Sequence, residues 1–80
     1  MKSLRTPDHV RLTTSLVSAR EKAGLTQQQL ADRLKKPQSF VAKYEGGERR
    51  LDVVEFIAIA HAVGFDPSRM IRELAAKFRR

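Results

Sequence analysis

The sequence predicts an all-α fold of five short helices joined by tight turns. Apolar residues recur at helical spacing from Leu12 to Phe78. No stretch alternates apolar and polar residues for long, and no Asn-Gly hairpin dipeptide occurs. Signals that start a helix and glycines that end one follow each other along the chain. Every break between segments therefore reads as a helix boundary.

The first two helices begin at threonines. Thr6 followed by Pro7 is typical of an N-cap and a first helical residue, and Gly24 ends that segment. Thr26 and Gln29 have the spacing of a capping box, in which each side chain bonds a free backbone N–H. The expected buried positions are Leu12, Leu16, Ala19, Ala23, Leu30, Ala31 and Leu34.

The third helix is short and lies between a proline and two glycines. Pro37 disfavours helix at the residue before it and opens the next helix itself. The segment ends at Gly46-Gly47, and its apolar positions are Phe40, Val41 and Tyr44. We interpret the two aromatic rings as core side chains; the alternative is base stacking, as in single-strand binders.

The last two helices begin at aspartates. Asp52 with Glu55 is a second capping box, which we take as the full explanation of these two carboxylates. The helix that follows, VVEFIAIAHAV, is apolar almost all round, so we expect it to be the most buried. Gly64 ends it, and Asp66-Pro67 starts the amphipathic segment PSRMIRELAAKF.

Length and composition favour a single small domain with a polyanionic partner. The 80 residues suit one domain, 1–80, whose residues 1–5 and 79–80, together with Lys77, we expect to fray. A net charge of +7 favours a polyanionic partner such as nucleic acid. Cysteine is absent, and the start of the chain has no secretory signal. No apolar run reaches the roughly 20 residues that span a bilayer, so we expect a cytoplasmic protein without membrane contact.

The segment Thr26–Glu45 has the form of a helix-turn-helix, in which the second helix enters the DNA major groove. The free N–H groups at the start of the first of these helices, with the Gln27 amide, suit a phosphate. Gln reads adenine, Lys donates to guanine or phosphate, and an Ala methyl meets thymine. The predicted base-reading residues are Gln38, Ser39, Ala42 and Lys43. Ordinary solvent-exposed surface is the alternative.

The chain resembles the lambda-repressor-like, Cro/Xre-type helix-turn-helix regulators of bacteria and phages. The resemblance covers Ala19–Gly64 and rests on GLTQQQLA, FVAKYE and GGERR followed by an apolar helix. It implies a five-helix DNA-binding domain and a structural ion pair between Arg20 and Glu45. It also implies DNA contacts from Gln27, from the predicted base-reading residues and from the loop with Arg49 and Arg50. The predicted phosphate-binding residues are Gln27, Lys36, Arg49 and Arg50.

Two residues depart from the family pattern. Lys35 stands where glycine usually ends the second helix, and a left-handed Lys there costs roughly 1 kcal/mol. Pro37 stands where Ser or Thr usually caps the third helix, which removes a side-chain acceptor.

Catalysis and metal binding are not expected. No nucleophile elbow, P-loop or HExxH motif occurs, so we predict a protein that is not an enzyme and needs no cofactor. His9 and His61 lie far apart without neighbouring ligands, which argues against a metal site.

We predict that the protein forms a homodimer through the fifth segment, because one short recognition helix reads too few base pairs for useful specificity. The proposed interface is Phe65, Met70, Ile71, Leu74 and Phe78, with part of the fourth helix. Packing within one chain is the alternative.

The sequence thus predicts a sequence-specific double-stranded-DNA-binding transcriptional regulator, a repressor or autoregulator, that binds an inverted repeat as a homodimer. The alternatives are an antitoxin, a restriction–modification controller, and a basic membrane or RNA binder. A toxin or RNA polymerase is a conceivable protein partner, and no small-molecule ligand is expected.

Overall fold

The computed structural model of the protein describes residues 6–78 and confirms the all-α fold. Its elements are α1 (Pro7–Lys22), α2 (Gln27–Leu34), α3 (Gln38–Glu45), α4 (Val53–Val63), α5 (Pro67–Ala75) and the 3₁₀ turn η1 (Ala76–Phe78). Within residues 6–78 the chain forms no strand. The predicted fraying of residues 1–5 and 79–80 lies outside the described residues.

Local capping explains where the helices begin. The Gln29 backbone N–H donates to Thr26 Oγ1 at 3.0 Å, and the Thr26 N–H donates to Gln29 Oε1 at 2.9 Å. Asp52 forms the same reciprocal box at the start of α4. Pro37 offers α3 no side-chain cap. Lys35 ends α2 in the left-handed region at φ 58°, where a side chain is unfavourable.

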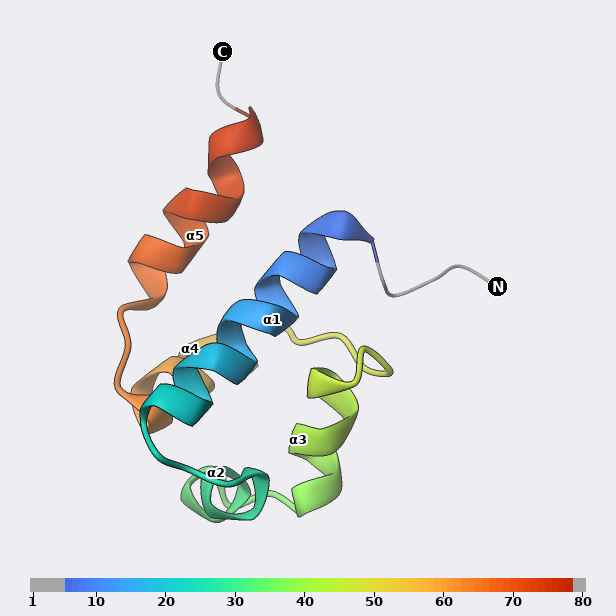
Figure 1. Ribbon diagram of the computed structural model, residues 1–80, viewed down its shortest axis with the longest axis vertical. Helices are drawn as coiled ribbons and strands as arrows, with labels where there is room; N and C mark the ends of the chain where they lie inside the picture. Colours follow the sequence, from blue (N-terminus) through green and yellow to red (C-terminus); the bar gives the residue numbers. More distant parts are fainter. Residues whose placement is uncertain (1–5, 79–80) are drawn as a thin grey trace.

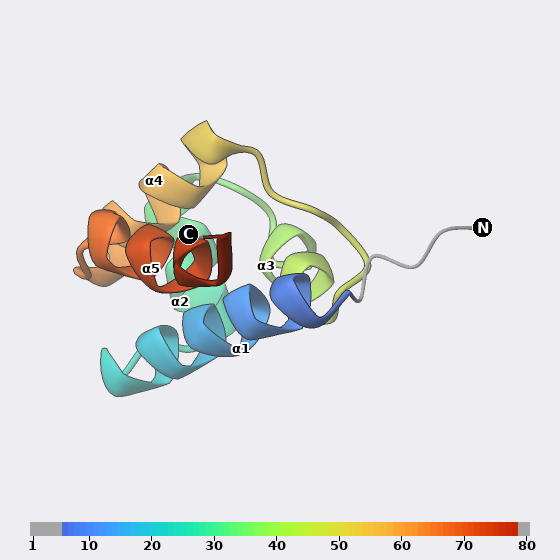
Figure 2. The same ribbon diagram turned by 90° about the horizontal axis from the view of Figure 1, so that it is seen from above.

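The helices surround one small core. In Figure 1, α2 and α3 lie together at the bottom, α1 crosses the middle in front of α4, and α5 rises towards the C-terminus at the top. Figure 2 shows α5 beside α1, on the opposite side of the molecule from α3. The buried side chains that meet between them are Leu16, Leu30, Ala31, Val41, Tyr44, Phe56 and Ile59. Ala23, which we expected to be buried, is exposed because it is the C-cap residue of α1.

The prediction that the fourth helix is the most buried is confirmed: α4 has three buried residues, and none of the other described helices has more than two. Only one side of α4 faces the core, through Phe56, Ile59 and Ala60. On its other side, Val53 is 67% exposed, Val54 76% and Ile57 48%. An apolar sequence on all sides does not bury every side of a helix when the described elements pack against one side only.

That Lys77 frays stays a prediction. The α-helix ends at Ala75, and Lys77 lies in η1, where its Nζ is 2.9 Å from Asp8 Oδ2 of α1. Both side chains are about half exposed, so the pair adds little stability. The pair joins η1 to the first turn of α1. Among residues 6–78, no helix is both long and apolar enough to cross a bilayer.

Candidate nucleic-acid interface

Helix α3, the predicted recognition helix, presents a polar face to solvent. Its Val41 and Tyr44 side chains are fully buried, which turns Gln38, Ser39 and Lys43 outwards. Ala42 is half-buried, so less of its methyl group is available to a base than that of a fully exposed alanine. Three of the four predicted base-reading side chains thus lie exposed on one short helix.

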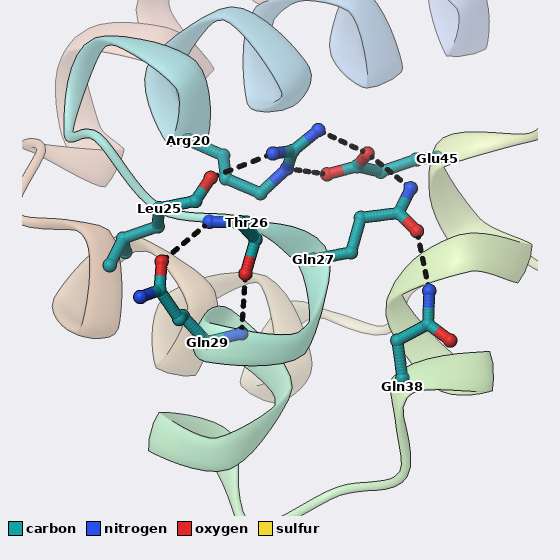
Figure 3. Close-up of polar contacts among 7 residues, drawn as sticks. All are labelled: Arg20, Leu25, Thr26, Gln27, Gln29, Gln38 and Glu45. Atoms are coloured by element: carbon teal, nitrogen blue, oxygen red, sulfur yellow. Dashed lines mark hydrogen bonds and ion pairs between the residues drawn. The ribbon is translucent and has the colours of Figure 1, made fainter.

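An ion pair ties α3 to α1. Arg20 Nε lies 2.8 Å from Glu45 Oε2, and Arg20 Nη2 lies 3.1 Å from Glu45 Oε1 (Figure 3). The Arg20 Nη1 group donates to the Leu25 carbonyl at 2.7 Å. The two charged side chains are only 12% and 6% exposed. The hydrogen bonds to Glu45 raise the pKa of Arg20, so the pair stays charged.

The same carboxylate orients two glutamines. Gln27 Nε2 donates to Glu45 Oε1 at 3.0 Å, and Gln38 Nε2 donates to Gln27 Oε1 at 2.8 Å (Figure 3). A carboxylate only accepts hydrogen bonds, so the Gln27 amide must turn its nitrogen towards Glu45. Its oxygen then faces Gln38, which fixes that amide as well. This chain of contacts sets the direction of Gln38 at the start of the recognition helix.

A second cluster holds the loop between α3 and α4. Arg49 Nη1 and Nη2 lie 3.0 and 2.8 Å from the two carboxylate oxygens of Glu55. The Arg49 guanidinium also lies 4.8 Å from the centre of the Phe40 ring, and Lys36 Nζ lies 5.6 Å from it. The hydrogen bonds from Arg49, and then from the Asp52 backbone, lower the pKa of Glu55 to about 2.

Other predicted contact residues remain available to a ligand. Arg50, Lys43 and Ser39 are exposed, and within residues 6–78 their side chains form no hydrogen bond or ion pair. Phe40 is half-buried, packs against the core and meets the Tyr44 ring edge-on at 5.6 Å. The two rings therefore serve as packing groups, as predicted.

The predicted dimer residues divide into two groups. Phe65 and Met70 are half-buried and pack against the core, whereas Ile71 is 47% exposed and Phe78 71%. Ile71, Leu74 and Phe78 line one wall of a cleft of about 600 Å³ between α5 and α1. No α5 side chain is fully buried, although the helix is strongly amphipathic.

Sequence reasoning missed three features. Capping does not explain Glu55 completely, because the same carboxylate also binds Arg49. His9 is buried, and neither its Nε2 nor the Tyr44 hydroxyl finds a hydrogen-bond partner among residues 6–78. Burial lowers the pKa of His9, and Arg50 adds to this effect; burial raises the pKa of the Tyr44 phenol. No clear sequence signal marks a buried polar atom.

The acidic and histidine side chains are too scattered to hold a metal ion together. In the part of the chain that the structure describes, no three His, Cys, Asp or Glu side chains gather as metal ligands.

Comparisons with known proteins give a consistent result. The helix-turn-helix family model matches residues 16–70. The XRE-family like protein from Pseudomonas syringae pv. tomato str. DC3000 is 44% identical, with a TM-score of 0.84 over 90% of this chain and 88% of that one. No curated protein sequence matches the chain significantly.

Two more distant structures share the fold. The restriction-modification controller protein C.AhdI from Aeromonas hydrophila is 28% identical, with a TM-score of 0.72 over 79% of this chain and 91% of that one. The clp gene regulator ClgR from C. glutamicum has a TM-score of 0.76 over 94% and 97% of the two chains, and its 20% identity supports the fold alone. The chain therefore belongs to the Cro/Xre-type helix-turn-helix family and is a DNA-binding transcriptional regulator rather than an enzyme.

Proposed function

We propose that this regulator reads a specific sequence in double-stranded DNA through the start of α3. The observation that carries the proposal is the chain of contacts from Arg20 through Glu45 and Gln27 to Gln38. A side chain that is already oriented loses less conformational freedom when it binds a base. The recognition face is thus prepared before DNA arrives.

Gln38 keeps the groups needed to read adenine. Its Nε2 uses one hydrogen for Gln27 and retains the second, while its Oε1 remains free. These two atoms suit the N7 acceptor and the N6 donor of adenine in the major groove. Ser39 and Lys43 lie on the same exposed face and contribute to the neighbouring positions.

The proposed phosphate contacts come from residues before and after α3 in the chain. Gln27 begins α2, where free backbone N–H groups accompany its amide. Lys36 lies just before α3 and Arg50 just after it, and both are exposed cations. Arg49 belongs to the same predicted set, but its charge is already paired with Glu55.

We further propose that two copies associate through α5 and bind an inverted repeat. The support is an amphipathic helix with exposed Ile71 and Phe78 beside a cleft that Asp8, His9 and Arg50 also line. A second copy would cover the apolar α5 side of this cleft. Paired recognition helices would then contact half-sites about one helical turn apart. An autoregulator would bind such a site at its own promoter.

The test is selection of the purified protein against randomised duplex DNA at physiological salt, followed by sequencing of the bound fraction. An enriched inverted repeat supports specific readout and the dimer together. Gln38→Ala should then lose preference at one base position, whereas Arg50→Ala should weaken binding to every sequence. Retention of the whole pool without enrichment would contradict specific readout.

Control of a restriction–modification system is a second candidate, favoured by the similarity to C.AhdI. The selected motif discriminates between the two. A site upstream of neighbouring endonuclease and methyltransferase genes supports the controller, and a site at the gene's own promoter alone supports a simple autoregulator.

A further inference from the structure

We propose that Glu55 is a positioning residue for DNA binding, which holds Arg49 as a clamp on the recognition helix and leaves Arg50 as the phosphate-binding arginine of the loop. The inference rests on the proposed function, because it assigns roles within the same DNA-binding surface. The sequence predicted that Arg49 and Arg50 both bind phosphates. In the present proposal only Arg50 of the two binds a phosphate, and Arg49 holds the recognition helix.

Glu55 makes three contacts at the start of α4. Its Oε1 accepts from the Asp52 backbone N–H at 2.9 Å and from Arg49 Nη1 at 3.0 Å, while its Oε2 accepts from Arg49 Nη2 at 2.8 Å. One carboxylate therefore caps α4 and also binds Arg49 of the loop between α3 and α4. The Glu55 side chain is 20% exposed and that of Arg49 is 40% exposed, so the pair lies at the edge of the solvent.

Arg49 in turn contacts the recognition helix. Its guanidinium lies 4.8 Å from the centre of the Phe40 ring, and Phe40 belongs to the first turn of α3. The same guanidinium donates to the Arg50 carbonyl at 2.8 Å, which constrains the backbone of the next residue. At the other end, the loop is tied to α3 by the Glu48 N–H, which donates to the Lys43 carbonyl at 2.9 Å.

The charge of Arg49 is poorly placed to attract a phosphate. A guanidinium has five N–H donors, and three of those on Arg49 are used by Glu55 and the Arg50 carbonyl. A phosphate that approached the remaining two would also meet the negative charge of Glu55. The pair is neutral as a unit, so it releases few counterions on binding DNA.

The next residue, Arg50, differs from Arg49 because its charge is unpaired among the described residues. It is exposed, and its guanidinium has neither a hydrogen bond nor an ion pair within residues 6–78. The two neighbouring arginines therefore provide a matched comparison between a paired and an unpaired cation on the same loop.

Salt dependence of DNA binding distinguishes these roles, because only a cation that binds phosphate contributes to the slope of log K against log salt. The probe is the duplex selected with the wild-type protein, with a scrambled duplex as reference. The variants are Arg49→Gln, Arg50→Gln, Glu55→Gln and the double variant Arg49→Gln/Glu55→Gln. Binding is measured at a temperature at which circular dichroism shows each variant fully folded.

We expect Arg50→Gln to lower the slope by about 0.9 for each protomer bound. Arg49→Gln and Glu55→Gln should each weaken binding to the selected duplex by roughly two- to tenfold without lowering the slope. The double variant should bind like either single variant, because each removes the same pair. Glu55→Gln keeps an oxygen for the Asp52 N–H, so α4 retains its cap.

Two results would overturn the assignment. The first is a slope that Arg49→Gln lowers as much as Arg50→Gln does. The second is an Arg49→Lys variant that binds like wild type, since lysine keeps the charge but cannot form the two-pronged bond to Glu55. If the wild type does not prefer the selected duplex over the scrambled one, the proposed function is contradicted. This measurement uses the wild type alone, so it is separate from the test of Glu55 and Arg49.

Discussion

Removing the Glu45 carboxylate should be among the most damaging single changes to this protein. In Glu45→Ala, three hydrogen bonds disappear: two from Arg20, at 2.8 and 3.1 Å, and one from Gln27 at 3.0 Å. Arg20 keeps only its bond to the Leu25 carbonyl. Its side chain is 12% exposed, so water replaces the lost partner poorly.

The magnitude follows from this burial. Loss of one partner of a buried ion pair costs roughly 3–5 kcal/mol, because the other charge remains buried without compensation. A typical domain of 80 residues has an unfolding free energy of roughly 4–12 kcal/mol. The variant should therefore be marginally stable, with a Tm lowered by roughly 12 °C or more.

Thermal and urea unfolding followed by circular dichroism measure this effect, with Glu73→Ala as the matched control. The Glu73 side chain is 55% exposed, and its Oε2 lies 3.4 Å from Arg69 Nε. Its removal should therefore lower the free energy of unfolding by less than about 1 kcal/mol. Replacing both partners, as in Arg20→Met/Glu45→Leu, should recover much of the stability, since neither charge is then stranded. A Glu45→Ala variant that unfolds no more easily than Glu73→Ala would refute the role given to burial.

Three further stability predictions and one on assembly follow from single residues. Lys35→Gly should raise the urea midpoint by an amount equivalent to roughly 1 kcal/mol, because Lys35 has φ 58° and glycine tolerates that conformation. Burial holds the pKa of His9 below 6.5, so the folded state binds a proton less readily than the unfolded chain. Wild-type stability should fall as the pH drops below 6.5, and this loss should shrink in His9→Leu. Glu55 has a pKa of about 2 against 4.5 ordinarily, so the stability it contributes above pH 4.5 should be lost between pH 4.5 and 2, a loss that Glu55→Gln should not show. Ile71→Asp should yield a monomer in sedimentation equilibrium, and an unchanged dimer would move the interface away from α5.

Helix boundaries were predictable because their causes are local. The capping boxes at Thr26 and Asp52 join residues only three apart, and the chain forms them whatever surrounds it. Lys35 was less predictable: it stands where the family usually has glycine, and only the structure shows that it keeps the left-handed conformation, with φ 58°. Helical spacing identified Leu16 and Leu30 as inward-facing positions.

Which side of α4 is buried was not predictable from its own composition. Its sequence is apolar on both sides, and only the neighbours that pack against it decide which side is covered. Val53, Val54 and Ile57 are exposed because the described part of the chain offers them no partner. The contact between Lys77 and Asp8 is a second example, since the two residues lie 69 positions apart in the sequence.

By itself, the sequence determined the helix class, the places where helices start and stop, and the polar residues at the beginning of α3. These follow from interactions between residues three or four apart, which form in the same way in any helix. Only the tertiary structure decided that Glu45 would orient Gln27 and Gln38, and that Glu55 would take the charge of Arg49. Hydrogen bonds and ion pairs between separate elements depend on side-chain positions to within a few tenths of an ångström, and packing of the helices sets those positions.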